Sequence, residues 1–331
     1  QDYTLNILHI NDFHSRIEPI NRFDSTCDAE DDAEGKCFGG IARVKTKLDE
    51  RRSSLSSTDQ NVLFVIGGDQ FQGSLFYSTY KGKADVEFTN QMGVDAMVLG
   101  NHEFDDGPEV LAEYIKAADF PIISGNILFG ANTPLGDSVA PYLIKEVGGE
   151  KIGILSATAT DTEERSSPGP GLLFVDEVQA LQDQVSELEE MGVNKIVLVS
   201  HVGFPRDKEI AAMVDGLDVI VGGHSNTLLS NIRDRATDVY PTMVENPSGM
   251  QVPIVHAYAY SKYLGELRVT FDDDGNVLRA NGEPHLLDAS VEPDAEFASR
   301  VLELAGPIEE LKGTIVGETT EPINGNREQC R

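Results

Sequence analysis

The sequence predicts an α/β protein in which helices cover the faces of β-sheets. Two observations support this prediction: short apolar runs rich in β-formers recur along the chain, and helical patterns lie between many of them. Most of the runs are almost continuously apolar, which is typical of buried strands. With 331 residues and 40% hydrophobic side chains, the chain is long enough to bury a large core.

The elements alternate through most of the chain. The predicted strands are 4–10, 62–66, 96–99, 121–124, 151–155, 195–200, 217–221, 252–257 and 264–271. The predicted helices are 41–52, 84–91, 108–117, 175–191 and 206–214, with helix-start signals at Pro108 and Asp176. The clearest loops are 27–39, 166–171 and 234–249, and a last helix-like segment ends at residue 312.

The charge balance is strongly acidic. The chain has 26 Lys and Arg against 56 Asp and Glu, a formal net charge of −30. This balance excludes a surface that neutralises nucleic-acid phosphates or anionic lipid. An anionic substrate therefore needs local attraction, and bound cations would supply it. The alternative is that the acidic surplus only keeps the protein soluble, and both explanations can hold together.

Three cysteines occur, and two of them, Cys27 and Cys37, flank an acidic loop-like run. The short loop keeps both thiols close, which favours a local disulfide and an oxidising compartment. The alternative is a pair of free thiols beside a disordered loop. Cys330 has no partner, which suggests a chain cut before its partner. No apolar run approaches the roughly 18 residues that a membrane span needs.

Polar clusters directly follow the ends of predicted strands: NDFH, GGDQ, GNHEFD, SHVG and GGHSN. Asp12 and His14 lie two residues apart, so an extended backbone would send both side chains to one side. Asp69 follows two glycines, which let the backbone approach closely and expose a short carboxylate. A dinuclear hydrolytic centre needs a bridging carboxylate, further N and O ligands, and an open position for water.

Each cluster taken alone is weak evidence, because a lone histidine after a strand is more often a surface or hydrogen-bonding residue. His9 and His285 lack the strand-end setting. His9 is interpreted as a core residue or as one that supports a ligand, and His256 and His285 are interpreted as structural. The tyrosines of AYAYSKYLG could form a base-stacking patch, but alternation along a strand favours a structural role. The acidic run DAEDDAE resembles a calcium loop only loosely and is expected to be a solvated loop.

Five motifs, LHINDFHSR, GGDQFQGS, GNHEFDDG, SHVG and GGHSNT, occur in this order and resemble those of the calcineurin-like metallophosphoesterases. Within that group they resemble the 5'-nucleotidase family, with the cysteine-bounded loop and GGHSNT ending of its ecto-enzymes. The resemblance covers nearly the whole chain. It implies a four-layer α-β-β-α sandwich, in which two mixed sheets are flanked by helices.

The resemblance also implies roles for individual side chains. The implied ligands are Asp12, His14 and Asn226 on a first cation, Asp69 bridging both cations, and Asn101, His201 and His224 on a second. Some bacterial relatives carry glutamine at the position of Asn226. His102 and Asp105 are the implied catalytic pair, with the imidazole stabilising charge on the phosphoryl group or leaving oxygen. The alternative for His102 is a further ligand or a packing role.

The implied function is a two-metal phosphohydrolase, most simply a 5'-nucleotidase that uses a metal-bound hydroxide to release phosphate from nucleoside 5'-monophosphates. The expected cations are two zinc ions, with manganese, cobalt or magnesium as alternatives. Apyrase, nucleotide-sugar hydrolase and cyclic-nucleotide hydrolase activities are alternative functions. The alternative from another functional class is a binding module without catalytic activity, in which the metal ions only stabilise the fold. The expected partner is a small nucleotide or phosphate ester, with no nucleic acid and an unknown oligomeric state.

Three segments are expected along the chain: a catalytic domain at 1–290, a linker-like helix at 291–312, and at 313–331 the start of a C-terminal nucleotide-binding domain that is otherwise absent. The residues that bind the base would lie in that domain. The cysteine pattern and the family resemblance place the protein outside the cytoplasm, in a periplasm or secreted to the cell surface.

Overall fold

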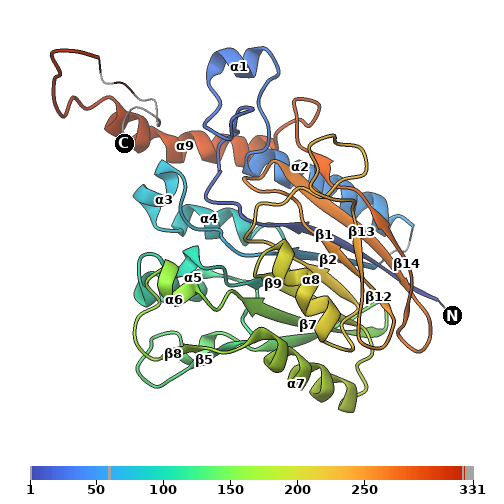
Figure 1. Ribbon diagram of the computed structural model, residues 1–331. Helices are drawn as coiled ribbons and strands as arrows, with labels where there is room; N and C mark the ends of the chain where they lie inside the picture. Colours follow the sequence, from blue (N-terminus) through green and yellow to red (C-terminus); the bar gives the residue numbers. More distant parts are fainter. Residues whose placement is uncertain (1, 59–60, 323, 325–331) are drawn as a thin grey trace.

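The computed structural model describes residues 2–58, 61–322 and 324. Two mixed β-sheets pack face to face, and helices cover the outer face of each sheet (Figure 1). This arrangement confirms the predicted four-layer α-β-β-α sandwich. A separate two-stranded ribbon pairs β5 (Ile127–Phe129) with β8 (Leu172–Phe174).

The first sheet has the strand order β14-β13-β1-β2-β3-β4, and β15 pairs with β13. Its strands are β1 (Tyr3–Ile10), β2 (Asn61–Ile66), β3 (Ala96–Val98), β4 (Ile122–Ile123), β13 (Tyr263–Phe271), β14 (Val277–Gly282) and β15 (His285–Leu286). The strands β1 to β4 are parallel, whereas β13 runs antiparallel to β1. The parallel strands therefore end at one edge of the sheet.

The second sheet has the order β11-β12-β10-β9-β7-β6. Its strands are β6 (Tyr142–Val147), β7 (Glu150–Thr158), β9 (Ile196–His201), β10 (Val219–Val221), β11 (Thr242–Glu245) and β12 (Gln251–Val255). The inner four strands are parallel, and the edge strands β6 and β11 are antiparallel to their neighbours.

Helices cover the two outer faces. The helices on the first sheet are α2 (Ile41–Ser56), α3 (Leu75–Tyr80), α4 (Lys83–Thr89), α5 (Pro108–Ala117) and α9 (Ala295–Lys312). Those on the second sheet are α7 (Glu177–Glu190) and α8 (Phe204–Met213). Short turns form α1 (Ala29–Ala33), α6 (Thr162–Arg165), η1 (His102–Phe104) and η2 (Gly136–Ser138).

The strand β1 is buried on both faces, which explains its continuous apolar sequence. Leu5 and Ile7 belong to the core between the two sheets, whereas Leu8 and Ile10 belong to the core beneath the first helical layer. Each fully buried side chain of this size stabilises the fold by roughly 1.5–3 kcal/mol. The helix α9 uses Phe297 and its buried neighbours in the same way, and packs against α2.

Several sequence-based expectations are corrected by the structure. Edge strands β6 and β14 were not predicted, because their half-exposed faces carry charged side chains and lack a continuous apolar run. Tyr258 and Tyr260 do not alternate along a strand: β12 ends at Val255, and both tyrosines lie in the turn before β13 with φ of 58° and 59°. The predicted loop at 234–249 also contains β11, and the one at 27–39 contains α1.

Cys27 and Cys37 form the predicted disulfide, with their Cα atoms 5.7 Å apart. The bond closes the excursion that carries α1. Cys330 lies outside the described residues. Among the helices of the described part of the chain, none combines the length and the apolar character that a membrane span requires. The further domain expected after residue 312 stays a prediction.

The double variant C27S/C37S is expected to unfold more easily, because the reduced chain gains freedom in a loop closed across 10 residues. The expected loss is about 2–3 kcal/mol in the free energy of unfolding. Urea unfolding monitored by circular dichroism measures this loss, with the oxidised parent protein as reference. An unchanged unfolding midpoint would show that the disulfide does not stabilise this excursion.

Candidate metal centre

The side chains predicted to bind metal converge at one edge of the sandwich, where parallel strands of both sheets end. Asp12 and His14 follow β1, Asp69 follows β2, Asn101 follows β3, His201 ends β9, and His224 and Asn226 follow β10. The convergence arises because the two sheets face each other with these ends on the same side. Residues more than 200 positions apart in the sequence therefore become neighbours, as the bond from the His224 backbone to Asp12 shows.

The backbone at this edge is held in an unusual conformation. Five of the converging residues have positive φ values of 48–77°, a region that non-glycine residues rarely adopt. These residues are Asp12, His14, Asp69, His224 and Asn226. Such conformations cost on the order of 1–3 kcal/mol each, and they cluster at active sites and ligand clamps.

His14, Asp12 and Asp69 form one group. The Nε2 atom of His14 lies 3.7 Å from Oδ2 of Asp69 and 3.9 Å from Oδ1 of Asp12. The Nδ1 atom of His14 lies 3.0 Å from the carbonyl oxygen of Phe71. Because a carbonyl can only accept, Nδ1 carries the proton and Nε2 is left as a free ligand atom.

A second group lies on the other side of Asp69. The Nε2 atom of His201 is 3.1 Å from Oδ2 of Asp69, and Nδ1 of His201 donates to the carbonyl oxygen of Gly67 at 2.6 Å. Oδ1 of Asn101 lies 3.3 Å from Nε2 of His201 and 2.9 Å from Nδ1 of His224. Asp69 therefore takes part in both of the clusters that could hold a metal ion.

Two buried oxygens at this edge have no hydrogen-bond partner among the described residues: Oδ1 of Asp12 and Oδ1 of Asn226. The other oxygen of Asp12 accepts hydrogen bonds from Asn11 and from the backbone N–H of His224. A buried oxygen without a partner costs about 1–3 kcal/mol, which a cation would offset. Carboxylate, amide and imidazole atoms together suit a divalent ion. The residues present therefore fit a dinuclear centre.

In the metal-free site, His201 supplies positive charge to the buried carboxylates. Burial raises the pKa of Asp12 to about 7. Burial also opposes ionisation of Asp69, but the charge and hydrogen bond of His201 outweigh it and hold the pKa of Asp69 below its usual range. For His201, burial favours the neutral ring, yet the charge of Asp69 prevails and raises the pKa to about 10. Carboxylates buried this deeply require positive charge beside them.

His102 and Asp105 form a pair next to both groups. The Nδ1 atom of His102 lies 2.6 Å from Oδ2 of Asp105, and Oδ1 of Asp105 accepts from the hydroxyl of Ser166 at 2.6 Å. The bond to Asp105 raises the pKa of His102 to about 9, against a smaller effect of burial. His102 also lies in one cluster with His14 and Asp69, so its place fits the catalytic role and the ligand alternative.

Glu103 was missed by the sequence reasoning, although it lies inside the GNHEFD motif. It is fully buried, and its carboxylate accepts hydrogen bonds from the backbone N–H groups of Asp69, Gln70, Phe71 and Gly100. These bonds fix the turn that presents Asp69. Nothing in the sequence distinguishes Glu103 from a solvent-exposed glutamate, because a single glutamate in a helical turn ordinarily lies on the surface.

The remaining histidines belong to neither of the two ligand clusters found among the described residues. Each of His9, His256 and His285 bonds to a side chain elsewhere in the fold; the partners are Tyr240, Asp207 and Glu266, at 2.7, 2.6 and 2.6 Å.

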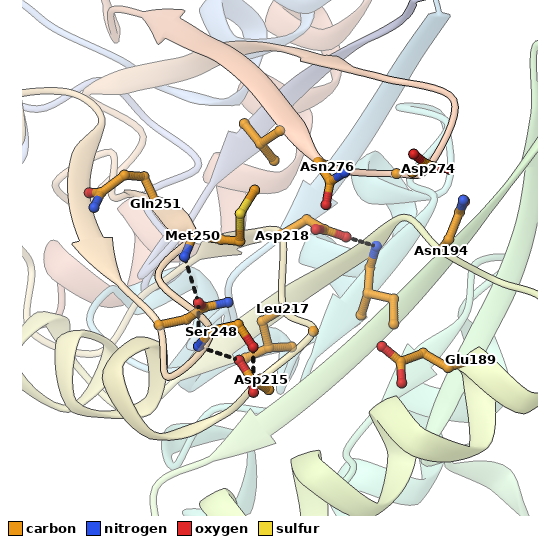
Figure 2. A pocket seen from close by; sticks show the side chains of 15 residues that line it. Glu189, Asn194, Asp215, Leu217, Asp218, Ser248, Met250, Gln251, Asp274 and Asn276 are labelled. Atoms are coloured by element: carbon orange, nitrogen blue, oxygen red, sulfur yellow. Dashed lines mark hydrogen bonds between the residues drawn. The ribbon is translucent and has the colours of Figure 1, made fainter.

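A separate pocket, drawn in Figure 2, lies where β9, β10, β12 and β14 begin, at the opposite end of the second sheet from His201. Its carboxylates hold the surrounding loops: Asp215 accepts from Ser248, and Asp218 accepts from the backbone of Ile196. No histidine is among the described residues that line it.

Comparison with known proteins identifies the family to which the chain belongs. The chain is 41% identical to a snake venom 5'-nucleotidase of Gloydius brevicauda, over 99% of this chain and 56% of the relative. The chain therefore spans just over half the length of that relative.

Solved structures agree. A 5'-nucleotidase precursor from Thermus thermophilus superimposes with a TM-score of 0.86 at 38% identity, covering 96% of this chain and 61% of that one. An NAD nucleotidase from Haemophilus influenzae gives 0.85 at 28% identity, covering 96% and 62%. The model of the protein family described as calcineurin-like phosphoesterase matches residues 5–227. The chain belongs to the calcineurin-like phosphoesterase family.

Proposed function

We propose that this chain is the catalytic part of a metal-dependent 5'-nucleotidase that releases phosphate from nucleoside 5'-monophosphates. The observation that supports it most strongly is the shared carboxylate of Asp69, which lies between two clusters of nitrogen and oxygen ligand atoms. The venom and Thermus relatives carry the same activity in their names. Because those relatives are longer, the activity of the whole protein is part of the proposal.

Each cation would have its own set of ligands. The first cation site consists of Asp12, His14, Asn226 and the shared Asp69, and the second cation site consists of Asn101, His201, His224 and the same Asp69. When bound, divalent cations polarise a phosphate ester and acidify a water molecule so that it can act as the nucleophile. The three imidazoles favour zinc over magnesium, which prefers oxygen ligands, and manganese and cobalt remain alternatives.

His102 and Asp105 would stabilise the transition state. Asp105 accepts the Nδ1 proton of His102, which orients the ring and favours its cationic form. The imidazolium then offers its Nε2 proton to the phosphoryl or leaving oxygen, where negative charge develops. The hydroxyl of Ser166 holds the second oxygen of Asp105, so the pair keeps one geometry before substrate binds.

Two observations bear on the alternatives. The Haemophilus neighbour is named as an NAD nucleotidase, which favours a dinucleotide or nucleotide-sugar substrate as the second candidate. Apyrase and cyclic-nucleotide activities use the same ligands, and a substrate panel on the longer protein separates all of these. The oriented His102–Asp105 pair supports catalysis over a silent metal-stapled module, because a structural metal site needs no partly exposed, proton-bearing imidazole.

A location outside the cytoplasm is supported by the disulfide and by the venom relative. Disulfides persist in oxidising compartments and are rare in the cytosol. Periplasm, secretion and the cell surface all satisfy this condition.

The chain with added Zn²⁺, Mn²⁺ or Co²⁺ is expected to hydrolyse p-nitrophenyl phosphate, and EDTA is expected to remove that activity. Release of p-nitrophenolate measures both effects. The variant D69N is the matched control, because it keeps the side-chain volume but removes the charge shared by both cation sites. Absence of turnover with every metal would contradict the proposed function.

Replacing His102 with alanine is expected to lower turnover roughly 10²- to 10⁴-fold, because a positioned proton donor is lost. Metal content, measured by mass spectrometry of the dialysed protein, should stay at two ions per chain. His285→Ala serves as the control, since His285 bonds to Glu266 away from the site. Loss of one ion in H102A would instead assign His102 as a ligand.

In the metal-free protein, His102 is expected to titrate with a pKa of about 9, and D105N should return this pKa toward 6.5 because the main cause of the shift is removed. Since the folded pKa is the raised one, the pair stabilises the fold fully below about pH 6.5 and loses this effect as pH rises through about 9. NMR of the imidazole protons measures the titration. Identical titration of His102 in both proteins would contradict the assigned cause.

A further inference from the structure

Tyr260 lies beside the first cation site, in the turn between β12 and β13. Its backbone N–H donates to the carbonyl oxygen of Asp12 at 2.8 Å. Its ring lies 5.7 Å from the ring of His14, and its hydroxyl oxygen accepts from Nδ2 of Asn226 at 3.2 Å. One residue therefore contacts three of the four residues that form this site.

The two ends of the Asn226 amide have different surroundings. The amide nitrogen of Asn226 is engaged by the hydroxyl, and the amide oxygen is buried without a hydrogen-bond partner among the described residues. Oxygen is the atom of an amide that can bind a cation, whereas the NH₂ group can only donate. With its nitrogen engaged, Asn226 keeps its oxygen available for a cation, and Oδ1 of Asp12 likewise has no partner in the described part of the chain.

The tyrosine is itself held in place. The guanidinium carbon of Arg16 lies 4.8 Å from the ring centroid of Tyr260. Arg16 in turn donates to the carbonyl oxygens of His14 and Gly73. Tyr260 has a φ of 59°, which an aromatic residue adopts only where the surroundings impose it. The backbone conformation of Tyr260 and the contact of its ring with Arg16 therefore fix the position of its hydroxyl group.

We propose that Tyr260 is a positioning residue that orients the amide of Asn226 for the first cation. This role rests on the proposed dinuclear centre. It predicts a selective effect: removing the hydroxyl weakens the first cation site about 10- to 100-fold, the usual cost of losing a group that orients a ligand. The second cation site keeps its affinity, because its hydrogen bonds and ring contacts involve other residues.

The test compares Y260F with Y258F. Phenylalanine keeps the ring against Arg16 and His14 and removes only the hydroxyl. Tyr258 lies in the same turn, and its hydroxyl bonds to Asp24 at 2.5 Å, so Y258F removes an equivalent group that bonds to a different partner. Isothermal titration of metal-free protein with Zn²⁺ and with Mn²⁺ gives both affinities, and thermal unfolding checks the fold.

The expected result is one weakened site in Y260F and two unchanged sites in Y258F. A second comparison, N226D against N226D/Y260F, isolates the orientation of the amide. Aspartate offers an oxygen in either orientation, so loss of the hydroxyl should then change the first affinity far less. An equal loss in both backgrounds, or equal affinities in Y260F and the parent, would overturn the role of Tyr260.

Failure of the proposed centre has a different signature. A parent protein that binds fewer than two cations would overturn the dinuclear site itself, and the role of Tyr260 with it. A parent that binds two, together with a Y260F variant that binds two equally well, would overturn only the role of Tyr260. Anomalous scattering from crystals of Y260F grown with Zn²⁺ locates the weakened ion directly.

Discussion

The position of the Asp69 carboxylate is the constraint on which the site depends. Asp69 is 2% exposed, adopts a positive φ, and lies between His14 and His201. The carboxylate of Glu103 accepts hydrogen bonds from the backbone N–H groups of Asp69 and Gln70. The backbone N–H of His102 donates to Oδ1 of Asp69. A carboxylate fixed in this way can face two ligand clusters at once, which is the geometry that a two-cation hydrolase requires.

The layered scaffold makes that position possible. Parallel strands in both sheets bring their carboxyl ends to one edge, and burial on both faces holds those ends rigid. The strained residues at the edge cost free energy that the large core offsets. At the same edge, the amide nitrogen of Asn226 donates to the hydroxyl of Tyr260, and this contact is the basis for the positioning role that we propose for Tyr260.

Much of the fold followed from the sequence, because buried strands and amphipathic helices carry periodic patterns that need no tertiary information. The strand β1 and the helix α5 are such elements, and both lie within one residue of their predicted bounds. The edge strand β6 was missed because half-exposed strands mix charged and apolar residues. Tyr260 was wrongly assigned to a strand. The strand β12 ends before it, in a turn whose positive φ values cannot be predicted from the local sequence.

The sequence by itself determined the chemistry of the candidate site: its clusters supply the carboxylates, amides and imidazoles, at strand ends, in the order typical of the family. Only the tertiary structure decided which of these atoms have hydrogen-bond partners among the described residues. Whether an oxygen of Asp12 lacks a partner within the described chain, or Glu103 binds backbone rather than solvent, depends on residues far away in the sequence. The bonds of Glu103 join the segments that follow the paired strands β2 and β3, and the bond from His224 to Asp12 joins the two sheets, so local sequence spacing cannot encode either geometry.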